Sequence, residues 1–270
     1  MFITALGLLL MSFSKLNNDN DVFTIKTVVI DAGHGGRDPG CVSGSNHEKT
    51  IALNIAKQLG KMITDSFKNV KVIYTREEDK YVELWERASI ANRNNADIFF
   101  SIHVNANDNV TVYGTESYAM GTHVVGKNLN ARKEEQEIAE TTKRENEVIL
   151  EEDGYQEKYD GFNPNDPASH IVFELFQSEY IEQSLELASK IQTKLKDHSN
   201  RRNRGVKQAG FVVLWKTTMP AVLIETGYLT NSDERTHLTS DHGQKNIASG
   251  IFSAFVDYKA SMESKSKSSD

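Results

Sequence analysis

The sequence contains little of what several protein classes require. It has one cysteine, Cys41, among 270 residues, which excludes an intramolecular disulfide framework and a metal site built from paired cysteines. Its formal net charge of −7 excludes the general basic surface with which proteins bind nucleic acid. Any metal site in this chain must therefore use histidine and carboxylate ligands.

The chain also lacks an apolar run long enough to cross a bilayer, which takes about 20 residues. Residues 1–13 are apolar and uncharged, and polar residues follow them. This length fits the apolar core of a secretory signal, and Ser12 and Ser14 place small residues at a cleavage site. We expect residues 1–14 to be a signal peptide, with a mature chain that has no transmembrane span and acts in the periplasm or cell wall. A buried N-terminal strand or helix is the alternative.

Short apolar runs alternate with segments of helical periodicity along the rest of the chain. Strands are predicted at 26–31, 70–75, 98–104, 115–120, 211–214 and 221–225, and helices at 48–67, 82–95, 171–195 and 244–258. This alternation predicts an α/β fold with a mostly parallel or mixed sheet. We expect one domain over residues 15–260, followed by a disordered tail at 261–270, which is rich in serine and lysine.

The composition changes between residues 121 and 167. Residues 131–153 contain nine acidic and four basic side chains and fit a helix up to about Leu150. Glycine and proline then indicate loops. We therefore treat residues 121–167 as a helical insertion in the domain.

Polar residues lie at strand ends where a buried apolar strand does not need them. His34 follows the first strand, His103 lies in the third and Glu225 ends the last, while Glu48 begins the first helix. In open α/β sheets, sites gather beyond the carboxyl ends of the strands. Two histidines and a carboxylate are a ligand set of hydrolytic zinc sites, and a second carboxylate is needed to move the proton of the attacking water. The alternative is that each histidine caps a loop or satisfies a buried hydrogen bond.

Five segments around these residues carry a family resemblance. They are VVIDAGHGGRDPG at 28–40, HEKTIALNIAKQL at 47–59, YTREED at 74–79, LWERASIANRNNADIFFSIHVNA at 84–106 and RGVKQAGFVVLWKTTMPAVLIETGYLTN at 204–231. Together, and in this order, they resemble the zinc-dependent N-acetylmuramoyl-L-alanine amidases of the type 3 class. The resemblance covers most of residues 26–258.

The resemblance implies a fold, a metal site and a reaction. It implies a three-layer α/β/α domain with one Zn²⁺ per chain held by His34, Glu48 and His103, and Glu225 as the catalytic carboxylate. The implied reaction is hydrolysis of the amide bond between N-acetylmuramic acid and L-alanine of the peptidoglycan stem peptide, in cell separation or wall remodelling. A zinc peptidase acting within the stem peptide is an alternative, and so is a non-catalytic peptidoglycan-binding regulator. Retention of Glu225 with all three ligands argues against the regulator.

Three further polar residues are candidates for contacting the substrate or supporting the ligands. Asn105 follows His103 by two positions and so points to the same side of its strand. Arg76 and Arg87 are the others, although such arginines are more often buried ion-pair partners of glutamates.

The resemblance also bears on the insertion. Some members, the division-associated amidases, carry a helical insertion here that blocks the metal site until a partner displaces it. In this chain the insertion follows strand 115–120, which we expect at the edge of the sheet. Glu145 and Glu147 are our candidates for occupying the open coordination position. We therefore expect an autoinhibitory cover and a protein activator, and the alternative is a solvated, charged helix.

Overall fold

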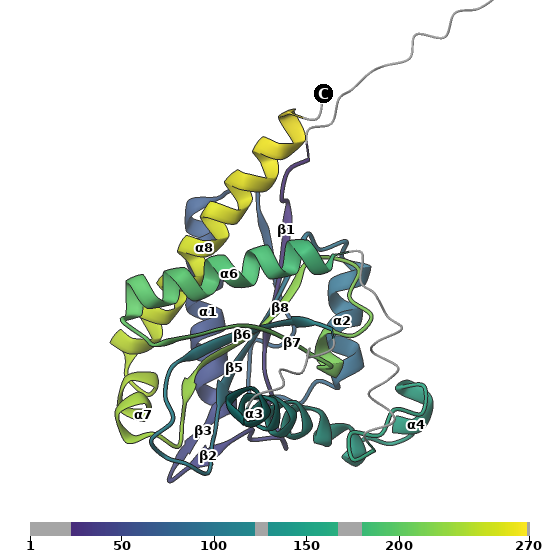
Figure 1. Cartoon of the computed structure of the whole chain (residues 1–270). Helices are drawn as coiled ribbons and strands as arrows, with labels where there is room; N and C mark the ends of the chain where they lie inside the picture. The colour runs from purple at the N-terminus through teal and green to yellow at the C-terminus, as the bar shows by residue number, and fades with distance from the viewer. Residues whose placement is uncertain (1–22, 122–128, 167–179, 269–270) are drawn as a thin grey trace, which may run out of the picture.

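The computed structural model describes residues 23–121, 129–166 and 180–268, which form a mixed sheet between two layers of helices (Figure 1). The strands are β1 (Thr27–Ala32), β4 (Lys71–Tyr74), β5 (Ile98–Asn105), β6 (Thr115–Met120), β7 (Asn203–Ala209) and β8 (Ala221–Tyr228), with β2 (Val42–Ser43) and β3 (Asn46–His47) paired separately. The helices are α1 (Glu48–Ser66), α2 (Leu84–Arg93), α3 (Leu129–Asn146), α4 (Tyr155–Lys158), α6 (Ile181–Ser199), α7 (Ser232–Leu238) and α8 (Asp241–Ser268), and the short 3₁₀ helices are η1 (Glu147–Glu151) and η3 (Val212–Leu214).

The sheet has the strand order β4-β1-β5-β8-β6-β7. All neighbouring strands are parallel except β6 and β8, which run antiparallel. Helices α1, α6 and α8 pack on one face, and α2 and η3 cover the other. The predicted α/β class and the implied three-layer architecture are confirmed.

Alternate residues of each central strand face opposite layers, as the two-residue period of a strand requires. In β5, Phe100 and Ile102 join the core beneath α1, α6 and α8, whereas Phe99 joins the core on the other face. His103 follows the phase of Phe99 and therefore lies on the α2 face. Glu225 is paired with His103 across β5 and β8, so both side chains lie on the same face of the sheet.

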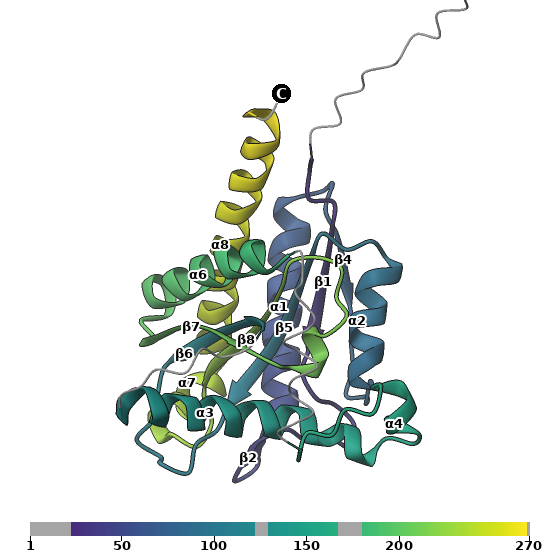
Figure 2. The ribbon, with the colours of Figure 1, turned by 45° about the vertical axis from the view of Figure 1, so that its right-hand side comes forward.

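Helix α3 of the insertion crosses the carboxyl end of β5 and extends toward α4 (Figure 2). Its Ile138 and the following Ile149 are buried in the same core as α2 and η3. The predicted helix in the insertion is thus present, and it docks on the domain through an apolar face as well as through charges.

Two predicted strand features are wrong. Residues 211–214, predicted as a strand, form the turn of η3, because the strand of this region, β7, is displaced to Asn203–Ala209. The apolar residues that follow β7 pack under α2 instead of pairing in the sheet. Strand 115–120 was expected at the sheet edge, but β7 pairs with β6 on its outer side and forms that edge.

The carboxyl-terminal segment also differs from the expectation of disorder. Helix α8 continues to Ser268, and Ser261 and Lys265 on this last part donate to the carboxylate of Glu186 on α6. The expected signal peptide at 1–14 lies outside the described residues. Within the described ranges, we find no helix with the length and apolar character that a membrane crossing requires.

Candidate metal centre and active site

His34 lies in a tight loop directly after β1. Its φ of 60° is in the left-handed region, which costs energy for a residue other than glycine and is typical of functional sites. Gly33 makes room for the second histidine, since a Cβ atom there would lie 2.5 Å from the ring of His103. The loop therefore brings the two imidazole rings together, with their centroids 4.9 Å apart.

Two buried arginines hold this loop by its carbonyl oxygens. Arg76 donates to the carbonyls of Ala32 and Gly33, and Arg87 donates to those of Ala32 and His34. The positioning of the His34 loop is thus the role that the structure assigns to Arg76 and Arg87. The alternative, a buried ion pair, holds for Arg87, although its partner is Asp31 and not a glutamate.

Arg87 also neutralises Asp31, which is buried at the end of β1. The distance from its Nη1 to Oδ1 of Asp31 is 2.9 Å, and both side chains are buried. Ser101 and Thr75 donate hydroxyl hydrogen bonds to the same carboxylate. Although burial raises the pKa of Asp31, Arg87 and these hydroxyls lower it below its usual value.

We expect Arg87→Leu to lower the free energy of unfolding by about 3–5 kcal/mol, because it leaves the Asp31 carboxylate buried without its cation. Urea unfolding followed by circular dichroism measures this loss. The double variant Asp31→Asn with Arg87→Leu is the control and should recover part of it. A loss below about 1 kcal/mol in Arg87→Leu would show that this pair does not stabilise the loop.

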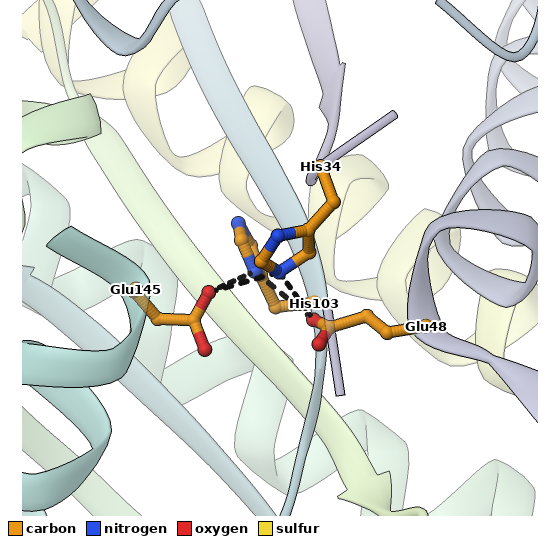
Figure 3. A group of neighbouring side chains, drawn as sticks. All are labelled: His34, Glu48, His103 and Glu145. Atoms are coloured by element: carbon orange, nitrogen blue, oxygen red, sulfur yellow. Dashed lines mark hydrogen bonds and ion pairs between the residues drawn. The ribbon is translucent and has the colours of Figure 1, made fainter. Parts of the chain in front are cut away.

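The four side chains of His34, Glu48, His103 and Glu145 converge on one point (Figure 3). Nε2 of His34 lies 3.1 Å from Oε1 of Glu48 and 3.0 Å from Oε2 of Glu145, and Nδ1 of His103 lies at the same two distances from these oxygens. All four side chains are buried, and their ligand atoms lie within 4.8 Å of one another. The structure thus brings together the three predicted ligands and one residue of the insertion.

Two of the predicted ligands, His34 and Glu48, are held by further hydrogen bonds. His34 donates from Nδ1 to Asp38 at 2.8 Å, which leaves its Nε2 lone pair directed into the cluster. Glu48 accepts backbone N–H bonds from Cys41 and Val104 at 2.9 and 2.8 Å. These contacts fix the ligand side chains before any metal binds.

The donor set fits a zinc ion. Zinc bonds of about 2.0–2.2 Å in a tetrahedron place neighbouring ligand atoms roughly 3.4 Å apart, close to the 3.0–3.1 Å observed. Nε2 of His34 and Oε2 of Glu145 are buried without a hydrogen bond among the described residues, as expected for atoms that bind a cation. Although burial lowers the pKa of His103, Glu145 and Glu48 raise it to about 10. The same negative potential attracts a divalent cation.

Glu225 lies beside the cluster and is completely buried on β8. Within the described part of the chain, neither of its carboxylate oxygens has a hydrogen-bond partner. Burial and the negative charges of Glu145 and Glu48 raise its pKa well above the usual range. A carboxylate with a raised pKa both accepts and returns a proton near neutral pH, which a general acid–base catalyst must do.

The insertion is connected to the site mainly by the last turns of α3. Glu145 enters the cluster, whereas Glu147, the second candidate, is about half exposed and pairs with Lys143 at 3.4 Å. Arg144 donates to Oδ1 of Asn105 at 2.8 Å, and Thr141 donates to the same oxygen. Asn105 thus binds the insertion in this structure instead of lining an open site.

The comparison with known families agrees with this geometry. The family described as N-acetylmuramoyl-L-alanine amidase matches residues 28–256, a span that contains every residue of the cluster and Glu225. The chain belongs to this amidase family. The resemblance inferred from the sequence motifs is confirmed.

Individual members of the amidase family are similar over most of this chain. The N-acetylmuramoyl-L-alanine amidase AmiA of Escherichia coli is 28% identical over 86% of this chain and 76% of its own length. A crystal structure of an N-acetylmuramoyl-L-alanine amidase from Clostridium difficile 630 is 28% identical, with a TM-score of 0.63 over 88% of this chain and 99% of that one. The CwlD amidase of Clostridioides difficile, solved in complex with the GerS lipoprotein, is 27% identical with a TM-score of 0.61, over 87% of this chain and 99% of that one.

Sequence reasoning missed two groups of residues around this amidase site. Asp38 orients His34, and its place four residues after that histidine in the same glycine-rich loop was a signal for it. Glu116 is buried on β6, opposite Glu225, and binds Lys207 and Arg204 of β7. Because β7 was not predicted, no pattern in the sequence indicated this second group.

Proposed function

We propose that this chain is a metal-dependent peptidoglycan amidase that cleaves the bond between N-acetylmuramic acid and L-alanine. The observation that carries the proposal is the buried cluster of two histidines and two carboxylates beside the unpartnered carboxylate of Glu225. The family match supports the substrate, since its members are described by this activity.

His34, Glu48 and His103 would hold one zinc ion, and Glu225 would move the proton. A bound zinc ion supplies Lewis acidity to the scissile carbonyl and lowers the pKa of a water molecule to about 7. Glu225 accepts the proton of the attacking water and returns it to the leaving amine of L-alanine. Burial of Glu225 excludes bulk water from this transfer, and its pairing with His103 across β5 and β8 keeps it beside the ligands.

Mass analysis of digested peptidoglycan tests the reaction. An amidase releases intact stem peptides that begin with L-alanine. A zinc peptidase acting within the stem releases shortened peptides, and a non-catalytic regulator releases none. Either of these results would contradict the proposal.

We also propose that α3 is an autoinhibitory cover. Glu145 occupies the position at which water and substrate need access, and its Oε1 accepts a bond from Arg144 at 3.1 Å. Asn146 fastens the end of the helix, donating to the Gly210 carbonyl and accepting from the backbone N–H of Val212. These polar contacts are numerous but replaceable by water, which suits a cover that a partner displaces. The complex of the related CwlD amidase with a lipoprotein supports a protein partner here.

Replacement of Glu145 by alanine should raise basal activity on purified cell wall by about tenfold or more, because the closed state loses its contact with the cluster. The zinc content should stay near one per chain, since three ligands remain. Glu140→Ala, on an exposed position of the same helix, is the matched control. Unchanged activity in a zinc-loaded Glu145→Ala chain would contradict autoinhibition and favour a plain binding surface. Replacing residues 127–165 by a short glycine-serine link is a second test, and unchanged activity of that zinc-loaded chain would lead to the same conclusion.

The site of action follows from the substrate. Peptidoglycan lies outside the cytoplasmic membrane, so we propose that the chain is exported through the apolar segment 1–14 and acts in the periplasm or cell wall. We propose cell separation or wall remodelling as the process in which this amidase acts.

A further inference from the structure

Three carboxylates of α3 lie along one face of the helix. Glu134, Glu137 and Glu145 are separated by three and eight residues, which places them on the same side because α-helical neighbours recur every three to four residues. Glu145 reaches the metal-ligand cluster. Oε2 of Glu137 lies 2.7 Å from Nη2 of Arg204, and Oε1 of Glu134 lies 3.7 Å from Nζ of Lys207. The insertion therefore contacts the rest of the domain at a second charged site, formed by Arg204 and Lys207 of β7.

This second contact site consists of strand residues: Arg204 and Lys207 of β7, and Glu116 of β6. Lys207 and Arg204 donate to Oε1 of Glu116 at 2.9 and 2.5 Å, and Tyr228 donates to the same oxygen at 3.0 Å. Tyr118 donates to Oε2 at 2.6 Å. Although burial alone raises the pKa of Glu116, Lys207 and Arg204 lower it below its usual value. The carboxylate is therefore ionised and orients both cations.

The charges of this place do not balance without α3. Arg204 and Lys207 carry two positive charges, and Glu116 supplies one negative charge beneath them. With α3 in place, the side chains of Lys207 and Arg204 are only 4% and 14% exposed. In the closed state, Glu137 and Glu134 of α3 pair with these two cations. When α3 moves away, the sheet is left with a fixed cationic site.

The site opens into a groove. A cavity of about 370 Å³ is lined by Arg204, Lys207, Arg202 and Asn203 on the sheet side and by Glu134, Glu137 and Lys133 on the α3 side. The cations are thus within reach of a solute at the rim of the insertion.

The position of this groove relative to the reaction centre follows from strand register. His103, Glu225 and Glu116 lie opposite one another on β5, β8 and β6, and Arg204 lies on the next strand, β7. Neighbouring strands are about 4.8 Å apart, so Arg204 lies about 10 Å beyond Glu225. Eight residues of α3 separate Glu137 from Glu145, and the helical rise of about 1.5 Å per residue gives a similar distance of about 12 Å.

This distance corresponds to about three residues of an extended peptide, at about 3.3–3.6 Å per residue. The peptide product of an amidase begins at the cut bond and extends away from the metal. A free carboxylate about three residues along this peptide would reach the groove when the amino end is at the reaction centre. Charge-assisted contacts between carboxylates and arginine are stronger than contacts between neutral groups.

We propose that Arg204 and Lys207 form a subsite for the carboxylates of the stem peptide, and that Glu137 and Glu134 occupy it in the closed state. Carboxylates of the insertion then occupy two sites where we propose that the substrate binds, which are the metal cluster and the β7 cations. Glu116 is a positioning residue, because it acts only through the two cations. This inference rests on the proposed amidase function for the identity of its ligand.

Calorimetric binding of a synthetic peptide tests the subsite without catalysis. The probe is an acidic stem peptide that begins with L-alanine, and its control is the same peptide with every carboxylate amidated. In the full chain, the double variant Glu134→Gln and Glu137→Gln keeps the size of both side chains but removes the two carboxylates that pair with the cations. It should bind the acidic peptide about tenfold or more tighter than the unchanged chain does, and the amidated peptide no tighter.

Two further variants test whether the tighter binding of the acidic peptide depends on Arg204. Adding Arg204→Gln to the double variant should abolish the gain, and Arg204→Lys should retain part of it, since it keeps the charge. Glu140→Gln, exposed on the same helix, is the matched control and should bind like the unchanged chain. If Arg204→Gln does not fold, the acidic and amidated peptides on the double variant decide the matter, because that comparison leaves β7 intact.

Equal binding of the acidic and amidated peptides by the double variant would overturn the subsite. Failure of the amidase function is a separate result: the Glu145→Ala chain would then release no peptides beginning with L-alanine from peptidoglycan. Release of such peptides together with equal binding would reject the subsite alone.

Discussion

Replacing Glu225 by glutamine should lower kcat on peptidoglycan by about 10²–10⁴-fold, the usual loss when a general base is removed. Glutamine keeps the size of the side chain and one oxygen acceptor, but it cannot take a proton at neutral pH. Because Glu225 lies outside the ligand cluster, zinc content should remain near one per chain. Turnover of purified cell wall and elemental analysis of the same preparation measure both quantities.

The Glu145→Ala background makes this comparison sharper, because its higher basal rate leaves room to measure a large loss. Glu147→Gln is the control, since that carboxylate is about half exposed and pairs with Lys143. If Glu225→Gln loses its zinc, Glu225 is a ligand and the proposed division of roles is wrong. A rate within about threefold of the parent would exclude it as the proton acceptor.

Removal of the metal should abolish activity altogether. His103→Ala takes one nitrogen from the cluster, and we expect loss of both zinc and turnover. For the unchanged chain, a chelator should stop the reaction and zinc should restore it. The chelator should also lower Tm, because a ligand that binds only the folded state stabilises it by mass action, whereas Tm of His103→Ala should respond much less to it.

His198→Ala is the matched control for His103→Ala, because His198 is an exposed histidine of α6. It should keep its zinc, its activity and the response of Tm to chelator. Full activity of the unchanged chain after its metal has been removed, confirmed by elemental analysis, would contradict the mechanism.

Much of the fold and the central site could be predicted from the sequence because the relevant signals are local. A β-branched run that ends in a glycine-rich loop predicts where His34 lies, whatever surrounds it. Apolar alternation places His103 on a definite side of β5, and helical spacing places Glu48 at the start of α1. Parallel strands deliver their carboxyl ends to one edge, so residues far apart in sequence were expected to meet there.

The wrong sequence predictions concern segments whose structure depends on which other part of the chain they contact. The run at 211–214 is apolar enough for a strand, yet Asn203–Ala209 pairs with β6, and the later residues fill the core under α2. For Arg76 and Arg87 the sequence left open a role beside the site or a buried ion pair, and the His34 loop turns its carbonyls toward both of them. Both outcomes depend on neighbours that are distant in the sequence.

The sequence by itself determined the family and the α/β class and predicted the residues proposed to carry the chemistry, since each signal lies in a short local motif. Only the tertiary structure decided which residues of the insertion contact the metal-ligand cluster and the sheet. Glu145 and Glu147 are both glutamates and lie two residues apart, but Glu145 ends in the cluster, whereas Glu147 begins η1 and pairs with Lys143. The cationic place on β7 likewise exists only because Glu116, Arg204 and Lys207 meet across two strands, and the docking of α3 supplies the charges that complete it.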